Sequence, residues 1–155
     1  MKHFFYCICL LTALPVLACT YDGQFSNPFN QAYNGSFRVA LATHQAIDNQ
    51  KLTPAKTLTG AVGLQRTQWS LKQILPKLNS QFSSDLDILI IDTKLWAQVR
   101  LEQQAPTLTL HTPSASGDYP VILMSETTLV ALAKKQITLA EASELGILTL
   151  QPASQ

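Results

Sequence analysis

The chain has little charge and few cysteines. Charged residues make up only 14% of its 155 residues, with neither sign gathered in a long block, while apolar residues make up 46%. The lack of a basic stripe argues against nucleic-acid binding, and the apolar content favours a folded domain over a disordered chain. After residue 18 there is no phosphate-binding glycine loop, no cysteine pair, no serine elbow and no metal-type histidine spacing. We therefore expect no cofactor and no metal.

A membrane-spanning run is also missing. The apolar run that begins at Phe4 is shorter than the roughly 20 residues that a spanning helix needs. It is preceded by Lys2 and followed by the small residue Ala18 directly before Cys19, which is the pattern of a secretory signal. We therefore predict that residues 1–18 are a signal peptide.

The cysteines make position 19 distinctive. Cys7 and Cys9 leave with the signal, so Cys19 is the one thiol of the mature chain and has no partner for an internal disulfide. The segment from Val16 to Cys19 resembles the lipobox of bacterial lipoproteins, in which this cysteine is acylated. The resemblance implies a lipid anchor in the cell envelope. Some lipoproteins that stay in the inner membrane have Asp directly after the cysteine; this chain has Thr20 there, which favours the outer membrane. Ordinary signal cleavage at the same bond, which leaves a soluble periplasmic protein, is the alternative.

The residues after the signal are enough for one domain of ordinary size. Residues 19–35 are rich in Asn, Gln, Ser and Gly and are predicted to form a tether, followed by a domain at 36–151 and a tail at 152–155. Aromatic residues recur at every fourth position from Tyr21 to Phe37. They are expected to hold the tether against the domain; a docking segment for a partner is the alternative.

The periodicity of apolar residues predicts helices and strands in separate groups. The expected elements are helices at 36–50 and 64–81, a strand at 86–91, a strand or short helix at 95–101, strands at 107–112 and 120–124, helices at 125–135 and from the capping box at Thr138 to Gly146, and a strand at 147–150. Pro76 predicts a kink or break near Gln73 in the second helix. The strands at 107–112 and 120–124 are expected to form a hairpin.

This order of elements predicts an α+β fold. We expect a single domain in which a small, mainly antiparallel sheet has helices packed on one face.

Two groups of side chains could carry chemistry. His44 lies four residues before Asp48 on the first helix, so the two can touch. Asp85 and Asp87 point to the same side of the central strand. No nucleophile or second ligand stands at a telling distance from either group. We therefore predict structural roles and no catalytic residue, with a small periplasmic enzyme using His44 and Asp48 as an alternative.

Residues 121–150 are similar to the C-terminal part of sterol-carrier-protein-2-like domains, on the pattern of Leu129, Leu132, Ala142, Gly146 and Leu148. The resemblance implies an α+β fold with an apolar tunnel for lipid-like ligands, and it does not imply catalysis.

A ligand pocket is expected to involve Trp69, Trp96, Leu129 and Leu132, because large amphipathic side chains line apolar pockets. We therefore expect a non-enzymatic envelope lipoprotein, held in the membrane through Cys19 and facing the periplasm. Its domain would bind an envelope protein or an apolar ligand. A soluble periplasmic protein resembling a lipid carrier is the alternative.

Overall fold

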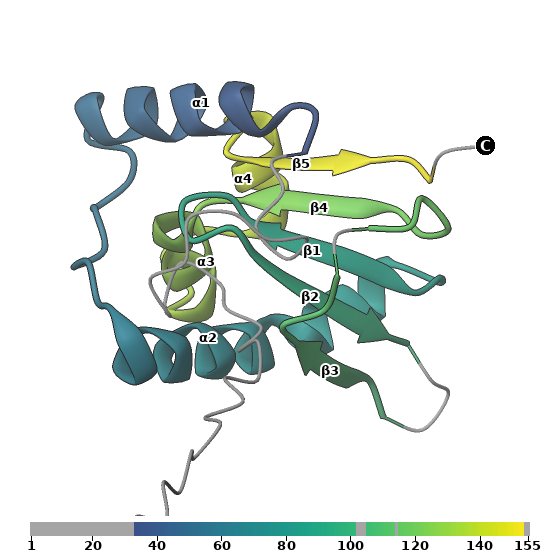
Figure 1. Cartoon of the computed structure of the whole chain (residues 1–155). Coiled ribbons are helices and arrows are strands. Elements are labelled where there is room, and N and C mark those ends of the chain that lie inside the picture. The colour runs from purple at the N-terminus through teal and green to yellow at the C-terminus, as the bar shows by residue number, and fades with distance from the viewer. Residues whose placement is uncertain (1–32, 102–104, 114, 154–155) are drawn as a thin grey trace, which may run out of the picture.

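The structure is a computed structural model that describes residues 33–101, 105–113 and 115–153. Its elements in chain order are α1 (Ser36–Asp48), α2 (Gly60–Gln81), β1 (Leu86–Ile90), β2 (Leu95–Arg100), β3 (Thr107–Leu110), β4 (Val121–Met124), α3 (Glu126–Ala133), α4 (Leu139–Glu144) and β5 (Leu148–Gln151). The predicted α+β class is confirmed (Figure 1).

The five strands form one open sheet in the order β3-β2-β1-β4-β5. The β1–β2, β2–β3 and β4–β5 pairs are antiparallel, and β1–β4 is parallel. The expected hairpin between residues 107–112 and 120–124 is therefore wrong, because β3 pairs with β2 and β4 pairs with β1. The physical reason is that the ambiguous segment forms a strand, β2, at residues 95–100. It turns back directly on β1 and takes β3 as its second neighbour, which leaves the other edge of β1 to β4.

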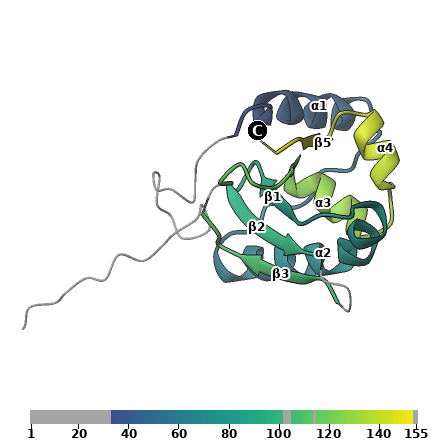
Figure 2. The same ribbon diagram turned by 90° about the vertical axis from the view of Figure 1, so that its right-hand side faces the viewer.

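The larger part of the core lies between the sheet and the helices. Alternate residues of β1, which are Leu86, Ile88 and Ile90, point to this side and are fully buried. They belong to one cluster with Leu71 and Leu78 of α2 and with residues of α3 and α4. Each such side chain contributes about 1.5–3 kcal/mol through burial. Figures 1 and 2 show α3 between α1 and α2.

The opposite side of the sheet carries a smaller apolar cluster. Leu89, Trp96 and Leu123 are adjacent across β2, β1 and β4 in the strand register, and Val39 of α1 packs with them. The ring of Tyr33 meets Trp96 edge-on, with centroids 5.6 Å apart and planes at 79°. The start of α1 is thereby fixed against this side.

Local sequence signals explain where α3 and α4 begin. The predicted capping box is present, because the Thr138 hydroxyl accepts from the Glu141 N–H while the Glu141 carboxylate accepts from the Thr138 N–H. Ser125 caps α3 by accepting from the N–H of Thr128. Of the kink or break expected near Gln73, the break is wrong, since α2 runs through Pro76 to Gln81, and the kink stays a prediction. The proline lies at an exposed position of this helix.

Candidate binding site

The two parallel strands end side by side and place polar groups there. β1 is followed by Ile91 and Asp92, and β4 is followed by the first turn of α3. The N–H of Glu126 donates to both carboxylate oxygens of Asp92, at 2.9 and 3.0 Å. In open sheets with parallel strands, ligands bind outside the carboxyl ends of those strands. This end of the sheet is therefore the first place to look for a site.

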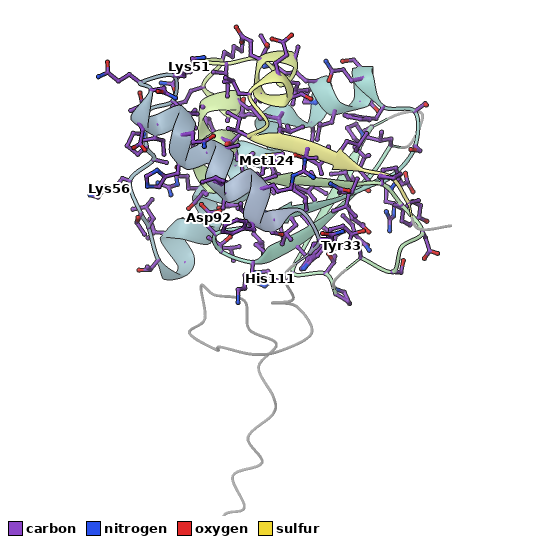
Figure 3. The ribbon with its side chains drawn as sticks, turned by 90° about the horizontal axis from the view of Figure 1, so that it is seen from above. Tyr33, Lys51, Lys56, Asp92, His111 and Met124 are labelled. Carbon is purple, nitrogen blue, oxygen red and sulfur yellow. The ribbon has the colours of Figure 1, made fainter. Side chains whose placement is uncertain are left out.

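A cavity of about 420 Å³ opens between α1 and this end of the sheet. We call it the α1 groove; its lining consists of Ser36, Phe37, Ala40, Thr43, His44, Ile47, Ile91, Asp92, Ser125 and Thr127. Its volume lies in the range of about 300–1,000 Å³ that is usual for small-molecule sites. Figure 3, seen from the α1 side, shows Asp92 next to this helix.

Apolar side chains dominate one part of the groove. Ala40 and Ile47 of α1 face Ile91 across it, and Phe37 lies at its rim with 79% of its surface exposed. A phenyl ring this exposed is a large unburied apolar surface, and Leu41 on the same helix is also 49% exposed. Clustered exposed apolar surface commonly marks a binding site.

A second, smaller cavity adjoins the groove. Residues 49–59 connect α1 to α2, and we call this segment the strap. Part of the strap (residues 55 and 57–59) lines a cavity of about 210 Å³ with Asp92, Thr93, Glu126 and Thr127. Asp92 and Thr127 line both cavities, so these two residues separate the groove from the strap pocket.

An ion pair near Asp92 joins α2 to the first turn of α3. Nη2 of Arg66 lies 2.8 Å from Oε1 of Glu126, Nε of Arg66 donates to the same oxygen at 3.2 Å, and so does the Thr67 hydroxyl at 3.0 Å. Arg66 also donates to the main-chain oxygen of Lys56, and the N–H of Ala55 donates to the Thr127 hydroxyl. These bonds fix the strap and the first turn of α3 to α2.

The protonation of Asp92 reflects its surroundings. Partial burial at the end of the sheet raises the pKa of its carboxyl, and the N–H bond from Glu126 acts in the opposite direction. The nearby Glu126 charge raises the pKa of Asp92 further. Asp92 is still exposed enough to meet a ligand, so its carboxyl group faces the groove.

The structure brings His44 and Asp48 together as predicted. His44 Nδ1 lies 2.9 Å from Asp48 Oδ2, and both side chains are largely exposed, at 77% and 64%. His44 therefore lies at the rim of the groove, not within an apolar helix face. Its hydrogen bond to Asp48 occupies Nδ1.

Asp85 and Asp87, before and within β1, line neither the α1 groove nor the strap pocket. Asp85 accepts from the N–H of Leu101 and lies 3.5 Å from Nε of Arg100. Asp87 is only 2% exposed, and its two carboxylate oxygens have no hydrogen-bond partner among the described residues. Burial raises the pKa of Asp87, which the Arg100 charge partly offsets.

The four residues expected around a ligand are not brought together. Trp96 is buried on one side of the sheet, whereas Leu129 and Leu132 are buried in the cluster on the other. Trp69 is 51% exposed on α2. None of the four lines the α1 groove, which sequence reasoning missed because its walls come from three distant segments. The signal that could have revealed it is Phe37, an aromatic residue one position into a helix.

Cys19 and most of the tether lie outside the described residues. Within residues 33–101, 105–113 and 115–153, no group of three or more acidic, histidine or cysteine side chains could hold a metal ion. The same residues contain no helix long and apolar enough to cross a bilayer.

Comparisons with known proteins do not identify a family for this chain. No protein-family profile matches the chain, and no curated protein matches it. Among solved structures it is similar to the stereoselective inverting sec-alkylsulfatase Pisa1 from Pseudomonas sp., with 16% identity over 56% of this chain and 12% of that one, at a TM-score of 0.39. A double mutant of the same sulfatase matches 44% of this chain and 11% of its own, with 19% identity and the same TM-score. Similarity at this level carries no argument about function.

Proposed function

We propose that this protein is a non-enzymatic envelope lipoprotein whose domain binds an apolar ligand in the α1 groove. The observation that carries the proposal is the groove itself, a concave site of about 420 Å³ with apolar side chains and an exposed Phe37 at its rim. The signal pattern and the lone Cys19 support the lipid anchor. The similarity of residues 121–150 to sterol-carrier-protein-2-like domains agrees with an apolar ligand.

Burial of apolar surface would supply the affinity. Covering a side chain the size of Phe37 yields about 1.5–3 kcal/mol, and each methylene of the ligand adds about 0.8 kcal/mol. Such terms are enough for micromolar binding once the costs of association are included.

A protein partner is the second candidate, and one observation favours it. Phe37 and Leu41 on α1 and Val62 and Trp69 on α2 are exposed large apolar side chains. They are spread over two helices, whereas the groove is a single concave surface. A small ligand therefore accounts better for the geometry.

Ligand binding is tested by filling the groove. Ala40 is exposed and lines the groove, so Ala40→Trp should block it. Gln45 is exposed on the same helix but does not line the groove, so Gln45→Trp is the matched control. The mature chain with Cys19→Ser is titrated with an apolar fluorescent probe whose emission rises in an apolar site. We expect binding to the parent and to Gln45→Trp and a loss of at least about tenfold in affinity for Ala40→Trp. Absence of binding to the parent, or equal binding to both variants, would refute the groove as the site.

The anchor is tested separately. Mass spectrometry of the protein from the membrane fraction should show an N-terminal Cys19 carrying acyl chains. Cys19→Ser should move the protein to the soluble fraction. An unmodified Cys19, or a wild-type protein that is already soluble, would replace the anchor by the soluble periplasmic alternative.

An enzyme built on His44 and Asp48 makes a different prediction. His44→Gln would abolish a hydrolytic activity, but it would leave apolar-probe binding close to that of the parent. Among the described residues, His44 bonds to Asp48 and no nucleophile bonds to its ring, so the ligand-binding proposal takes precedence.

A further inference from the structure

The lining of the α1 groove is divided into an apolar and a polar part. Phe37, Ala40, Ile47 and Ile91 supply the apolar part, and Asp92 lies with hydroxyl side chains at the ends of β1 and β4. A ligand that fits both parts must be amphipathic. The chemistry of its head group follows from what the polar part can still offer.

The hydroxyl groups of this polar part are already used by the protein. Thr43 donates to the main-chain oxygen of Val39, which satisfies its hydrogen. Ser125 accepts from the N–H of Thr128, and its hydroxyl also bonds to that of Thr128. Thr127 accepts from the N–H of Ala55. These groups shape the site, but each already has a protein partner.

Asp92 retains acceptor capacity. A carboxylate has about four lone-pair positions. The N–H of Glu126 is shared between the two oxygens, and the main-chain N–H groups of Asp92 and Thr93 also bond to the carboxyl. Three N–H groups therefore leave room for about one further donor, which an exposed side chain can accept from a ligand. An ionised Asp92 has no hydrogen to donate, so only a donor on the ligand can bond to it.

The groove offers no cation to an anionic head group. Its lining contains neither Lys nor Arg, and the one basic side chain, His44, is paired with Asp48. The N-terminus of α3 would ordinarily attract an anion, but Asp92 and Ser125 already accept from its first turn. A ligand carboxylate or phosphate would therefore lie beside the Asp92 carboxylate with no Lys or Arg of the lining to balance the two negative charges, which is unfavourable in a partly desolvated site.

Building on the proposed ligand-binding function, we propose that the α1 groove selects amphipathic ligands with a hydrogen-bond-donating head, either a hydroxyl or an ammonium group, bound by the Asp92 carboxylate. The apolar body of the ligand lies between Phe37 and Ile47 of α1 and Ile91 of the sheet. Long-chain carboxylates and phosphates are discriminated against by the same carboxylate.

The test compares three probes that share one chain and differ in the head group. Dodecanol, dodecylamine and dodecanoate, each below its micelle concentration, compete with the apolar fluorescent probe on the mature Cys19→Ser chain at neutral pH. We expect the alcohol and the amine to displace the probe at concentrations at least about tenfold lower than the carboxylate, since like charges side by side are costly.

The variant Asp92→Asn isolates the charge. It keeps an oxygen that can accept from Glu126, and it removes the negative charge from the groove. We expect the preference for the amine over the carboxylate to fall to within about threefold. Glu144→Gln is the matched control, because it also removes the charge of an exposed carboxylate but lies outside the groove lining, and it should leave the order of the three probes as in the parent.

The outcomes separate the two proposals. If the fluorescent probe does not bind at all, the proposed ligand-binding function fails. If the probe binds and the three competitors displace it equally, or the carboxylate does so best, the groove binds apolar chains and the inference about the head group is wrong. The unmutated series alone decides this point, even if Asp92→Asn does not fold.

Discussion

Arg66 and Glu126 form an ion pair that joins α2 to the first turn of α3, with Nη2 of Arg66 2.8 Å from Oε1 of Glu126. Both side chains are mostly buried, at 19% and 8% exposure. The pair lies 60 residues apart in the sequence. Because the main-chain oxygen of Lys56 accepts from the same guanidinium, one side chain positions the strap, α2 and α3 together.

We expect Arg66→Met to lower the free energy of unfolding by about 3 kcal/mol, because it leaves the Glu126 carboxylate buried without its cation. Lys72→Met is the control, since Lys72 is an exposed residue on the same helix. Urea unfolding followed by circular dichroism measures both. A loss for Arg66→Met no larger than that for Lys72→Met would show that the pair does not stabilise the fold.

The buried carboxyl of Asp87 makes stability depend on pH. Its pKa is raised above the unfolded value of 3.8, mainly by burial. As pH rises through the folded pKa, the folded state must ionise a group that the unfolded state ionises more easily, so stability is lost with increasing pH. Asp87→Asn lacks this ionisation. Its free energy of unfolding relative to the wild type should therefore rise as pH increases from the unfolded pKa of 3.8 to the raised folded pKa, by about 1.4 kcal/mol for each pH unit between the two.

Denaturant unfolding at several pH values gives this difference directly. Glu144→Gln, which changes an exposed carboxylate on α4, is the control for general charge effects. If the difference in free energy of unfolding between Asp87→Asn and the wild type stays constant or falls with rising pH, the pKa of Asp87 is not raised by burial.

Gly35 and Gly60 form a matched pair with left-handed backbone, at φ +89° and +59°. A Cβ at Gly35 would lie 3.2 Å from Nε2 of Gln151 and 3.3 Å from Cδ1 of Leu123, whereas one at Gly60 would meet nothing within 4 Å. We expect Gly60→Ala to cost about 1 kcal/mol from backbone strain and Gly35→Ala to cost clearly more. Melting temperatures of the two variants test this order; equal losses would mean that the contacts at Gly35 relax freely.

Pro76 lies within α2 and removes the hydrogen bond to the main-chain oxygen four residues earlier. Pro76→Ala should restore that bond and raise the free energy of unfolding by about 1–3 kcal/mol. Gln73→Ala, on an exposed position of the same helix, should change stability little because both residues favour helices. Chemical denaturation compares the two variants, and a destabilised Pro76→Ala would show that the proline is required for the local path of α2.

Features set by neighbouring residues could be predicted from the sequence. The capping box of Thr138 and Glu141 is an example, because both partners lie within one turn. The buried central strand β1 is another, since a short run of branched aliphatic residues predicts a buried strand. The contact between His44 and Asp48 follows in the same way from helical spacing.

Features that need distant segments could not be predicted. Strand pairing depends on which edges are free after the first turn has formed, and the sequence of 95–101 did not decide between strand and helix. The tryptophans show the same limit, since Trp96 packs with Tyr33 on one side of the sheet and Trp69 lies exposed on α2. The α1 groove requires α1, the end of β1 and the start of α3 to meet, and no local pattern encodes that meeting.

The parallel pairing of β1 with β4 has a consequence for how the chain matures. Asp87 of β1 pairs with Val121 of β4 in this ladder. During synthesis, β1 is therefore complete well before its partner strand β4 has been made. Until then β1 has only β2 beside it, and an open apolar edge is exposed to other chains. That edge must stay unpaired with other chains until β4 has been made. Its folding is therefore completed by the C-terminal segment, and we expect truncation before Val121 to give aggregation instead of a smaller folded domain.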